Sequence, residues 1–97
     1  MAQVVYAARA LDQLERSVPL LGAADPGAAR RTVAAIRSAV ESLATHPLIG
    51  RCVEGELREL VISYGATGYL ALYRFVVLRD QVRVLVLRSQ RDVGFLP

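Results

Sequence analysis

The spacing of apolar residues along the chain changes near Gly50, from a helical period to a strand period. Before this point, apolar residues recur every three or four positions in two stretches, as they do on one face of an amphipathic helix. The two sets are Leu11, Leu14, Val18 and Leu21, followed by Val33, Ile36, Val40 and Leu43. The first half of the chain therefore predicts two helices.

Proline and glycine set the expected limits of both helices. Pro19 predicts that the first helix is short or bent near its end, and Gly22 is a stop signal. Asp25 and Pro26 suit the start of the second helix, because Asp caps free N–H groups and Pro is favoured at the first helical position. The dipeptide His46-Pro47 is expected to end this helix.

Strands account for the remaining regular pattern. Short segments rich in β-branched or aromatic residues are expected at Gln3–Ala7, Glu56–Gly65, Gly68–Leu78 and Gln81–Ser89. The connections at 65–68 and 79–81 are short enough for hairpins, so the last three strands should be antiparallel neighbours. The expected fold is α+β, in the order β-α-α-β-β-β, with two N-terminal helices packed on one face of a small, mainly antiparallel sheet. The whole chain, 1–97, is expected to form a single domain.

Both faces of the last two expected strands are rich in apolar residues. In the third strand, Tyr69, Ala71, Tyr73, Phe75 and Val77 alternate with Leu70, Leu72, Arg74, Val76 and Leu78. In the fourth, Val82, Val84, Val86 and Arg88 alternate with Arg83, Leu85, Leu87 and Ser89. The helices can cover one face of these strands. The other face is either a docking surface edged by arginine or a fully covered face of a central strand.

The charge of the chain is carried unevenly. The net charge is +3, and all 12 basic residues are arginine. Biased codon usage would explain the choice of arginine over lysine, but it would not explain why seven of the arginines lie at or beyond Arg51. A basic second half indicates an anionic partner, which could be phosphate, nucleic acid or an acidic peptide.

Few groups in the sequence suit acid–base or metal chemistry. Cys52 and His46 are each the single residue of their type, so neither an internal disulfide nor a zinc site is expected. His46 is better explained as a loop residue than as a general base, and no cofactor or metal is expected. No apolar run approaches the ~20 residues of a membrane span, and the N-terminus lacks the pattern of a secretory leader. We therefore expect a cytoplasmic protein without a membrane partner.

Arginine is the remaining candidate for a functional group. The residues that could meet near one region of the sheet are Arg58, Arg74, Arg88, Gln90 and Arg91. A guanidinium group binds phosphate through two parallel hydrogen bonds, but its pKa above ~12 makes it unsuitable as a base. This set therefore suits phosphate binding, or stabilisation of charge that develops on a scissile phosphate. The alternatives are solvated arginines, or structural pairs of Arg58 and Arg74 with Glu59 or Asp92.

Several segments together resemble the RelE/ParE superfamily of type II toxins. They are THPLIGR at 45–51, LREL at 57–60, GYLALYR at 68–74 and VLVLRSQRDVGF at 84–95. The resemblance covers nearly the whole chain and includes the order of helices and strands. Toxins of this superfamily are encoded beside an antitoxin, whose C-terminal segment wraps the toxin and covers its functional surface. The resemblance thus implies a cognate antitoxin as partner.

The superfamily divides by target. RelE-like members cleave mRNA in the ribosome with basic side chains on the sheet and an aromatic residue near the C-terminus, whereas ParE-like members poison DNA gyrase. Leu70 occupies a position at which RelE-like nucleases carry arginine. Those nucleases also carry two basic residues on the preceding strand, where this chain has Arg58 at one position and Leu60 at the other. Arg91 matches the basic residue after the last strand, and Phe95 lies near the place of a terminal tyrosine but lacks its hydroxyl. This incomplete nuclease set favours either a ParE-like function or an unusual nuclease.

The resulting hypothesis is a toxin that is held inactive by a cognate antitoxin and acts on DNA gyrase. Its candidate target- or phosphate-binding residues are Arg74, Arg88, Gln90, Arg91 and Phe95. One alternative is a ribosome-dependent mRNA endoribonuclease, with Arg58, Arg88 and Arg91 around the scissile phosphate. Another is a non-toxic module that binds an acidic peptide. An exposed apolar sheet face also predicts assembly, as a homodimer or as a toxin–antitoxin heterotetramer.

Overall fold

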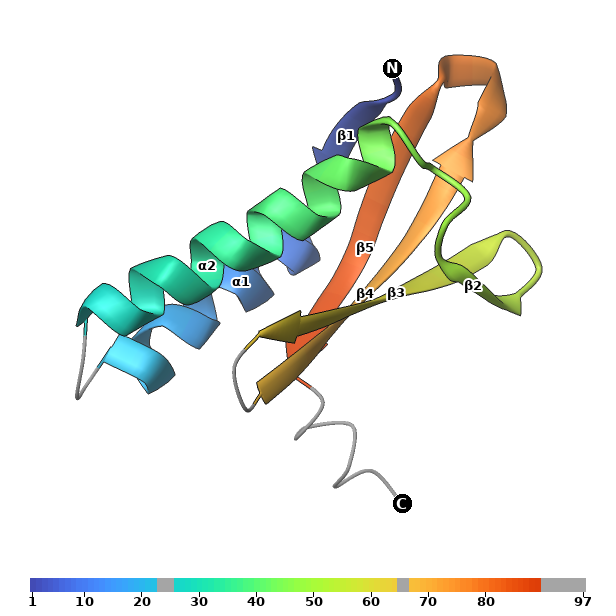
Figure 1. Cartoon of the computed structure of the whole chain (residues 1–97). Coiled ribbons are helices and arrows are strands. Elements are labelled where there is room, and N and C mark those ends of the chain that lie inside the picture. Colours follow the sequence, from blue (N-terminus) through green and yellow to red (C-terminus); the bar gives the residue numbers. More distant parts are fainter. Residues whose placement is uncertain (23–25, 65–66, 90–97) are drawn as a thin grey trace.

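A five-stranded mixed sheet with two helices forms the fold, seen in the computed structural model of Figure 1, which describes residues 1–22, 26–64 and 67–89. In chain order the elements are β1 (Gln3–Tyr6), α1 (Ala8–Gly22), α2 (Pro26–Glu41), β2 (Arg51–Glu54), β3 (Leu57–Tyr64), β4 (Thr67–Val76) and β5 (Gln81–Ser89). The strands lie in the order β1-β5-β4-β3-β2. β1 is parallel to β5, and the other neighbours are antiparallel. The expected α+β class is therefore confirmed.

The expected order of strands was wrong in one respect, because it lacked β2. All four residues of β2, Arg51–Glu54, are exposed, so the segment has no buried apolar residue to mark it as a strand. It becomes a strand only by pairing with β3, and a register irregularity between Cys52 and Glu54 interrupts that pairing. Such a short edge strand is specified by its neighbour in the sheet rather than by its own sequence.

The helices differ little from the expected ones. α1 continues through Pro19 and ends at Gly22, so the proline does not end the helix. α2 begins at Pro26 as expected, ends at Glu41 and is followed by a 3-10 turn at Ser42–Ala44. The predicted cap Asp25 lies outside the described residues. None of the helices in the described ranges is long and apolar enough to span a membrane.

One face of the sheet forms the core together with the helices, and we call it the helix-side face. Its buried strand residues are Ile62, Tyr69, Ala71, Tyr73, Val82, Val84 and Leu87. They cluster with Ala10 and Leu14 of α1 and with Ile36 and Val40 of α2. Figure 1 shows both helices on this side of the sheet. Burial of these side chains supplies the main favourable term for folding.

A β-bulge in β5 changes which of its residues reach the core. Tyr73 pairs with Val84 and Leu72 pairs with Val86, so Leu85 has no partner on β4. Beyond the bulge the alternation of β5 is shifted by one residue. The expected grouping of Val86 and Arg88 with Val84 was therefore wrong: Leu87 takes the buried position, and Arg88 faces the other side.

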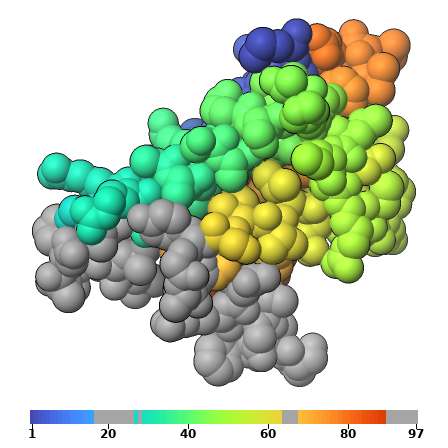
Figure 2. Space-filling view, viewed as in Figure 1, coloured from blue at the N-terminus to red at the C-terminus, as the bar shows by residue number. Residues whose placement is uncertain are grey.

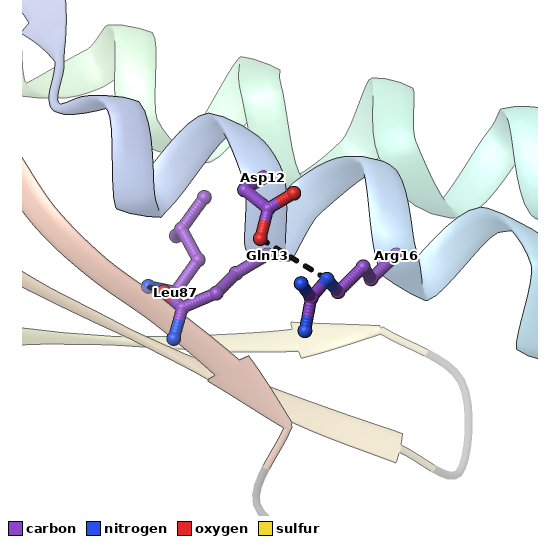
Figure 3. Close-up of polar contacts among 4 residues, drawn as sticks. All are labelled: Asp12, Gln13, Arg16 and Leu87. Atoms are coloured by element: carbon purple, nitrogen blue, oxygen red, sulfur yellow. Dashed lines mark hydrogen bonds and ion pairs between the residues drawn. The ribbon is translucent and has the colours of Figure 1, made fainter.

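The outer edge of β5 is shared between β1 and α1. β1 pairs with β5 only as far as Val84, and the N–H of Ala7 donates to the carbonyl of Val84 at 2.8 Å. Farther along, the side-chain Oε1 of Gln13 accepts a hydrogen bond from the N–H of Leu87 at 2.8 Å (Figure 3). A helix side chain thus replaces a strand at this edge, which satisfies a backbone donor that would otherwise be unpaired. Figure 3 also shows the ion pair between Asp12 and Arg16 on the same helix.

The turn between β4 and β5 sets the register of this hairpin. β4 ends at Val76, two residues earlier than expected, because Val77–Arg79 form a 3-10 turn. Asp80 then adopts a left-handed conformation with φ of 47°, and Val76 pairs with Gln81. The expected strand residues Val77 and Leu78 are consequently exposed at the tip.

Candidate functional site

The loop that connects α2 to β2 is fixed by two side chains from the sheet. The hydroxyl oxygen of Tyr73 accepts a hydrogen bond from the N–H of Gly50 at 2.8 Å. Nη1 of Arg58 donates to the carbonyl oxygens of Leu48 at 3.1 Å and of Gly50 at 2.8 Å. In the space-filling view this part of the chain, coloured green to yellow, forms one continuous surface from the end of α2 into β3 (Figure 2). We call this arrangement the loop clamp.

Gly50 is required because the backbone and Tyr73 approach each other closely. A Cβ atom at position 50 would lie 2.5 Å from the hydroxyl oxygen of Tyr73, 2.7 Å from its Cε1 and 2.9 Å from the carbonyl oxygen of Glu59. Tyr73 is fully buried, and burial raises the pKa of its phenol, while the hydrogen bond from Gly50 opposes that shift. The phenol is therefore neutral near pH 7 and acts as a structural acceptor.

The loop clamp gives a structural explanation for much of the sequence resemblance. Gly50, Arg58 and Tyr73 come from the three separate segments THPLIGR, LREL and GYLALYR, and they contact one another in the fold. The clamp holds a loop on which Leu48 and Ile49 are exposed. His46, Pro47, Leu48 and Ile49 line a pocket of about 380 Å³ beside it.

The sheet separates Arg58 from the other candidate arginines. Arg58 pairs with Tyr73 across β3 and β4, so it lies on the helix-side face. Arg74, the next residue along β4, points to the opposite face, as does Arg88, which pairs with Leu70. The sequence-based expectation that the three would meet is thus wrong for Arg58. Glu59, the expected partner of Arg58 or Arg74, instead pairs with Arg51 at 2.8 Å.

We call the side of the sheet away from the helices the open face. Its register positions are Gln3, Val5, Arg51, Glu54, Leu57, Glu59, Val61, Ser63, Gly68, Leu70, Leu72, Arg74, Val76, Gln81, Arg83, Val86 and Arg88. Arg74 and Arg83 are directly opposite each other, and both are exposed. Arg88 is half-buried and lies on β5 opposite Leu70, which is four residues from Arg74 along β4, or roughly 13 Å for a rise of about 3.3 Å per residue. Half-buried Leu72 and Val86 occupy the space between.

Few polar contacts involve the open-face arginines. In the described ranges, no hydrogen bond or ion pair is formed by the side chains of Arg74 or Arg88. Nε of Arg83 donates a hydrogen bond at 2.8 Å to Oε1 of Gln81, and this amide oxygen is a neutral acceptor. The predicted residues Gln90, Arg91 and Phe95, and the alternative partner Asp92, lie outside the described residues.

Groups that could transfer protons are scarce near these arginines. His46 is exposed on the loop after α2, and Cys52 is exposed on the edge strand β2. In the part of the chain that the structure describes, no three His, Cys, Asp or Glu residues gather as a metal site would need. The described open face can therefore attract anions, but it offers only Glu54 and Glu59 as titratable acids.

Sequence reasoning missed Arg83 as a candidate. Its place opposite Arg74 depends on the length of the turn at 77–80, which was expected two residues later. Counting outward from a hairpin centred on this turn would have revealed the pair, because cross-strand partners share one face.

The family to which the chain belongs emerges from comparison with known proteins. Residues 4–94 match the family described as the ParE toxin of the type II toxin–antitoxin system parDE. The chain belongs to this ParE toxin family. It is also 42% identical over 88 residues to Toxin RelE2 of Caulobacter vibrioides, with 87% of this chain and 100% of that protein covered. Toxin RelE3 of the same organism is 44% identical over 67 residues, which cover 69% of this chain and 71% of that protein.

Membership in the ParE toxin family confirms the expected resemblance and identifies the chain as the toxin of a type II toxin–antitoxin module. It also implies a cognate antitoxin as partner. The two relatives carry RelE names, whereas the matching family model is that of ParE.

Proposed function

We propose that this ParE-family toxin acts by inhibiting DNA gyrase and is neutralised by its cognate antitoxin. The observation that carries the proposal is the division of the candidate nuclease residues between the two faces of the sheet. Arg58 lies on the helix-side face, where its Nη1 donates to two loop carbonyls, while Arg88 lies on the open face. Two groups on opposite faces cannot contact one scissile phosphate.

The chemistry of the open face also supports a binding function rather than RNA cleavage. Hydrolysis or transesterification of RNA needs a group that moves a proton, and arginine is a poor candidate because its pKa exceeds ~12. Glu59, an acid at the middle of this face, is held by Arg51 at 2.8 Å. An arginine-edged apolar face without a poised acid or base suits recognition of another macromolecule.

The second candidate function is cleavage of mRNA at the ribosome, and the RelE names of the two relatives favour it. In this function Arg88 and Arg91 would stabilise the charge on the phosphate, and the ribosome would have to supply the proton-transferring groups that the described part of the open face does not offer. Arg58 would contribute only through the position of the loop.

A supercoiling assay with purified gyrase separates the two functions. We expect the unmodified toxin to abolish supercoiling and to accumulate cleaved DNA. Arg88→Ala and Arg91→Ala should each weaken this effect about tenfold, the size expected for one charged contact of roughly 1.4 kcal/mol. Arg30→Ala, which removes an exposed charge from α2, is the matched control and should leave inhibition unchanged.

The same proteins should be added to translating ribosomes in parallel. Normal supercoiling together with cut mRNA would reject the gyrase proposal in favour of the second function. Normal supercoiling, intact mRNA and normal growth after expression without the antitoxin would instead indicate a non-toxic binding module.

A further inference from the structure

Two arginines face each other on the open face without an acidic partner. Arg74 and Arg83 are directly opposed on β4 and β5, where Cα atoms of paired residues are about 4.5–5.5 Å apart. Like charges in this arrangement repel each other and destabilise a sheet. In the described ranges neither side chain forms an ion pair, and the contact of Arg83 with Gln81 uses Nε alone. The terminal nitrogens of two neighbouring guanidinium groups therefore remain available to an anion.

The charge balance of the whole open face points to the same conclusion. Among the described residues, this face carries four arginines, at 51, 74, 83 and 88, and two acids, Glu54 and Glu59. Arg51 and Glu59 neutralise each other. The excess of two positive charges on this face accounts for most of the net charge of +3. A partner that covers the face is thus expected to be acidic.

The neighbouring side chains favour a protein partner over a nucleic acid. Leu72, Val86 and Leu57 lie beside the arginine pair and are half-buried, so they can still bury apolar surface against a partner. The aromatic residues Tyr6, Tyr69, Tyr73 and Phe75 all lie on the helix-side face. Proteins that bind single-stranded nucleic acids usually stack bases on aromatic side chains, and the described open face presents none.

We propose that Arg74 and Arg83 together bind one carboxylate side chain of the antitoxin, within a segment that also places an apolar side chain on Leu72 and Val86. A carboxylate held between two guanidinium groups removes their repulsion and gains charge-assisted hydrogen bonds from both. Antitoxin binding therefore neutralises a like-charge pair that the free toxin carries unrelieved. The proposal rests on the proposed function only for the existence of an antitoxin and is independent of the target.

The test measures binding of the toxin to the tagged protein encoded by the adjacent gene. The variants are Arg74→Ala, Arg83→Ala and the double variant, and Arg30→Ala on α2 removes the same charge elsewhere. Because both arginines share one carboxylate, we expect each single substitution to weaken binding about tenfold, and the double substitution to add less than a further tenfold. The melting temperature of the free toxin should not fall in any of the three variants, since each relieves repulsion. Arg30→Ala should bind as the unmodified toxin does.

Several results would overturn the proposal. They include unchanged binding in the double variant, strictly additive losses, and an equal loss with Arg30→Ala, which would indicate general charge attraction. Unchanged antitoxin binding together with weakened retention on an RNA oligonucleotide would assign the pair to nucleic acid. Absence of any complex between the unmodified toxin and the adjacent protein would also reject it. The gyrase assay needs no antitoxin, so failure of the proposed function is recognised separately.

Discussion

The two faces of the sheet use the same residue type in opposite ways. On the helix-side face, the guanidinium of Arg58 is held by the carbonyls of Leu48 and Gly50, so its charge serves the fold. On the open face, Arg74 and Arg83 lie against each other with no acidic partner in the described ranges. Arg58 is a cross-strand partner of Tyr73, which directly precedes Arg74. A shift of one residue along β4, from the cross-strand partner of Arg58 to Arg74, therefore changes the face of the sheet and with it the expected role of the arginine.

The largest loss of stability is expected for a substitution at Gly50, which the helix-side residues Arg58 and Tyr73 hold in place. Gly50→Ala places a Cβ atom 2.5 Å from the Tyr73 hydroxyl oxygen, and the ring cannot yield because Tyr73 is fully buried. Overpacking and loss of the clamp hydrogen bond should lower the free energy of unfolding by about 3 kcal/mol. Thermal unfolding should show a melting temperature lower by roughly 15 °C.

Gly55 provides the control for Gly50→Ala. A Cβ atom at Gly55 would meet nothing within 4 Å, but φ is +55° there. Gly55→Ala should therefore lose only about 1 kcal/mol, from backbone strain. A loss at Gly55 as large as that at Gly50 would contradict the importance of the close approach to Tyr73.

Two tyrosines with buried hydroxyl groups, Tyr73 and Tyr6, should show a smaller difference in stability. Tyr73→Phe leaves the N–H of Gly50 without its acceptor and should lower the free energy of unfolding by about 1–3 kcal/mol. The hydroxyl oxygen of Tyr6 is buried and has no hydrogen-bond partner among the described residues, so Tyr6→Phe should be neutral or stabilising by up to about 1 kcal/mol. Burial raises the pKa of both phenols, so neither substitution removes a charge at pH 7.

Urea unfolding of the two phenylalanine variants measures this difference directly. Equal midpoints for Tyr73→Phe and Tyr6→Phe would show that the Tyr73 hydroxyl contributes nothing through Gly50.

Substitution of Arg58 and of Arg74 tests which of the two arginines contributes to the stability of the fold. Arg58→Met removes two hydrogen bonds to loop carbonyls and should lower the free energy of unfolding by about 1–2 kcal/mol. Arg74→Met relieves repulsion with Arg83 and should leave stability unchanged or raise it by up to ~0.5 kcal/mol. Differential scanning calorimetry of both variants provides the measurement. A stability loss with Arg74→Met would mean that the open face also uses this charge within the fold.

The smallest effect is expected for the ion pair between Arg51 and Glu59. The Arg51 side chain is 77% exposed, and such pairs contribute about 0–1 kcal/mol. Arg51→Ala should therefore change the melting temperature by no more than a few degrees. The change should diminish in 1 M salt, where the Debye length is about 3 Å. A salt-independent loss would indicate that Arg51 contributes through packing instead.

Local sequence was sufficient for the elements that carry their own pattern. The second helix was expected from Val33, Ile36, Val40 and Leu43, and the structure places α2 there with Pro26 as its first residue. The last strand was predicted with both its limits at Gln81 and Ser89. The second helix contains the helical period and a clear start residue, and the last strand is an apolar segment that directly follows the expected turn at 79–81.

Tertiary structure alone decided three features, which are strand β2, the bulge in β5 and the placement of the arginines on both faces of the sheet. β2 has no buried residue and forms because β3 offers it a partner. The bulge at Leu85 reverses the faces of Leu87 and Arg88, and no local preference of these residues requires it. The turn at 77–80 sets which residues of β4 and β5 are opposed, and it thereby places Arg74 against Arg83. The period of a segment determines what kind of element it forms, but register determines which side chains meet, and register depends on pairing between segments that are distant in the chain.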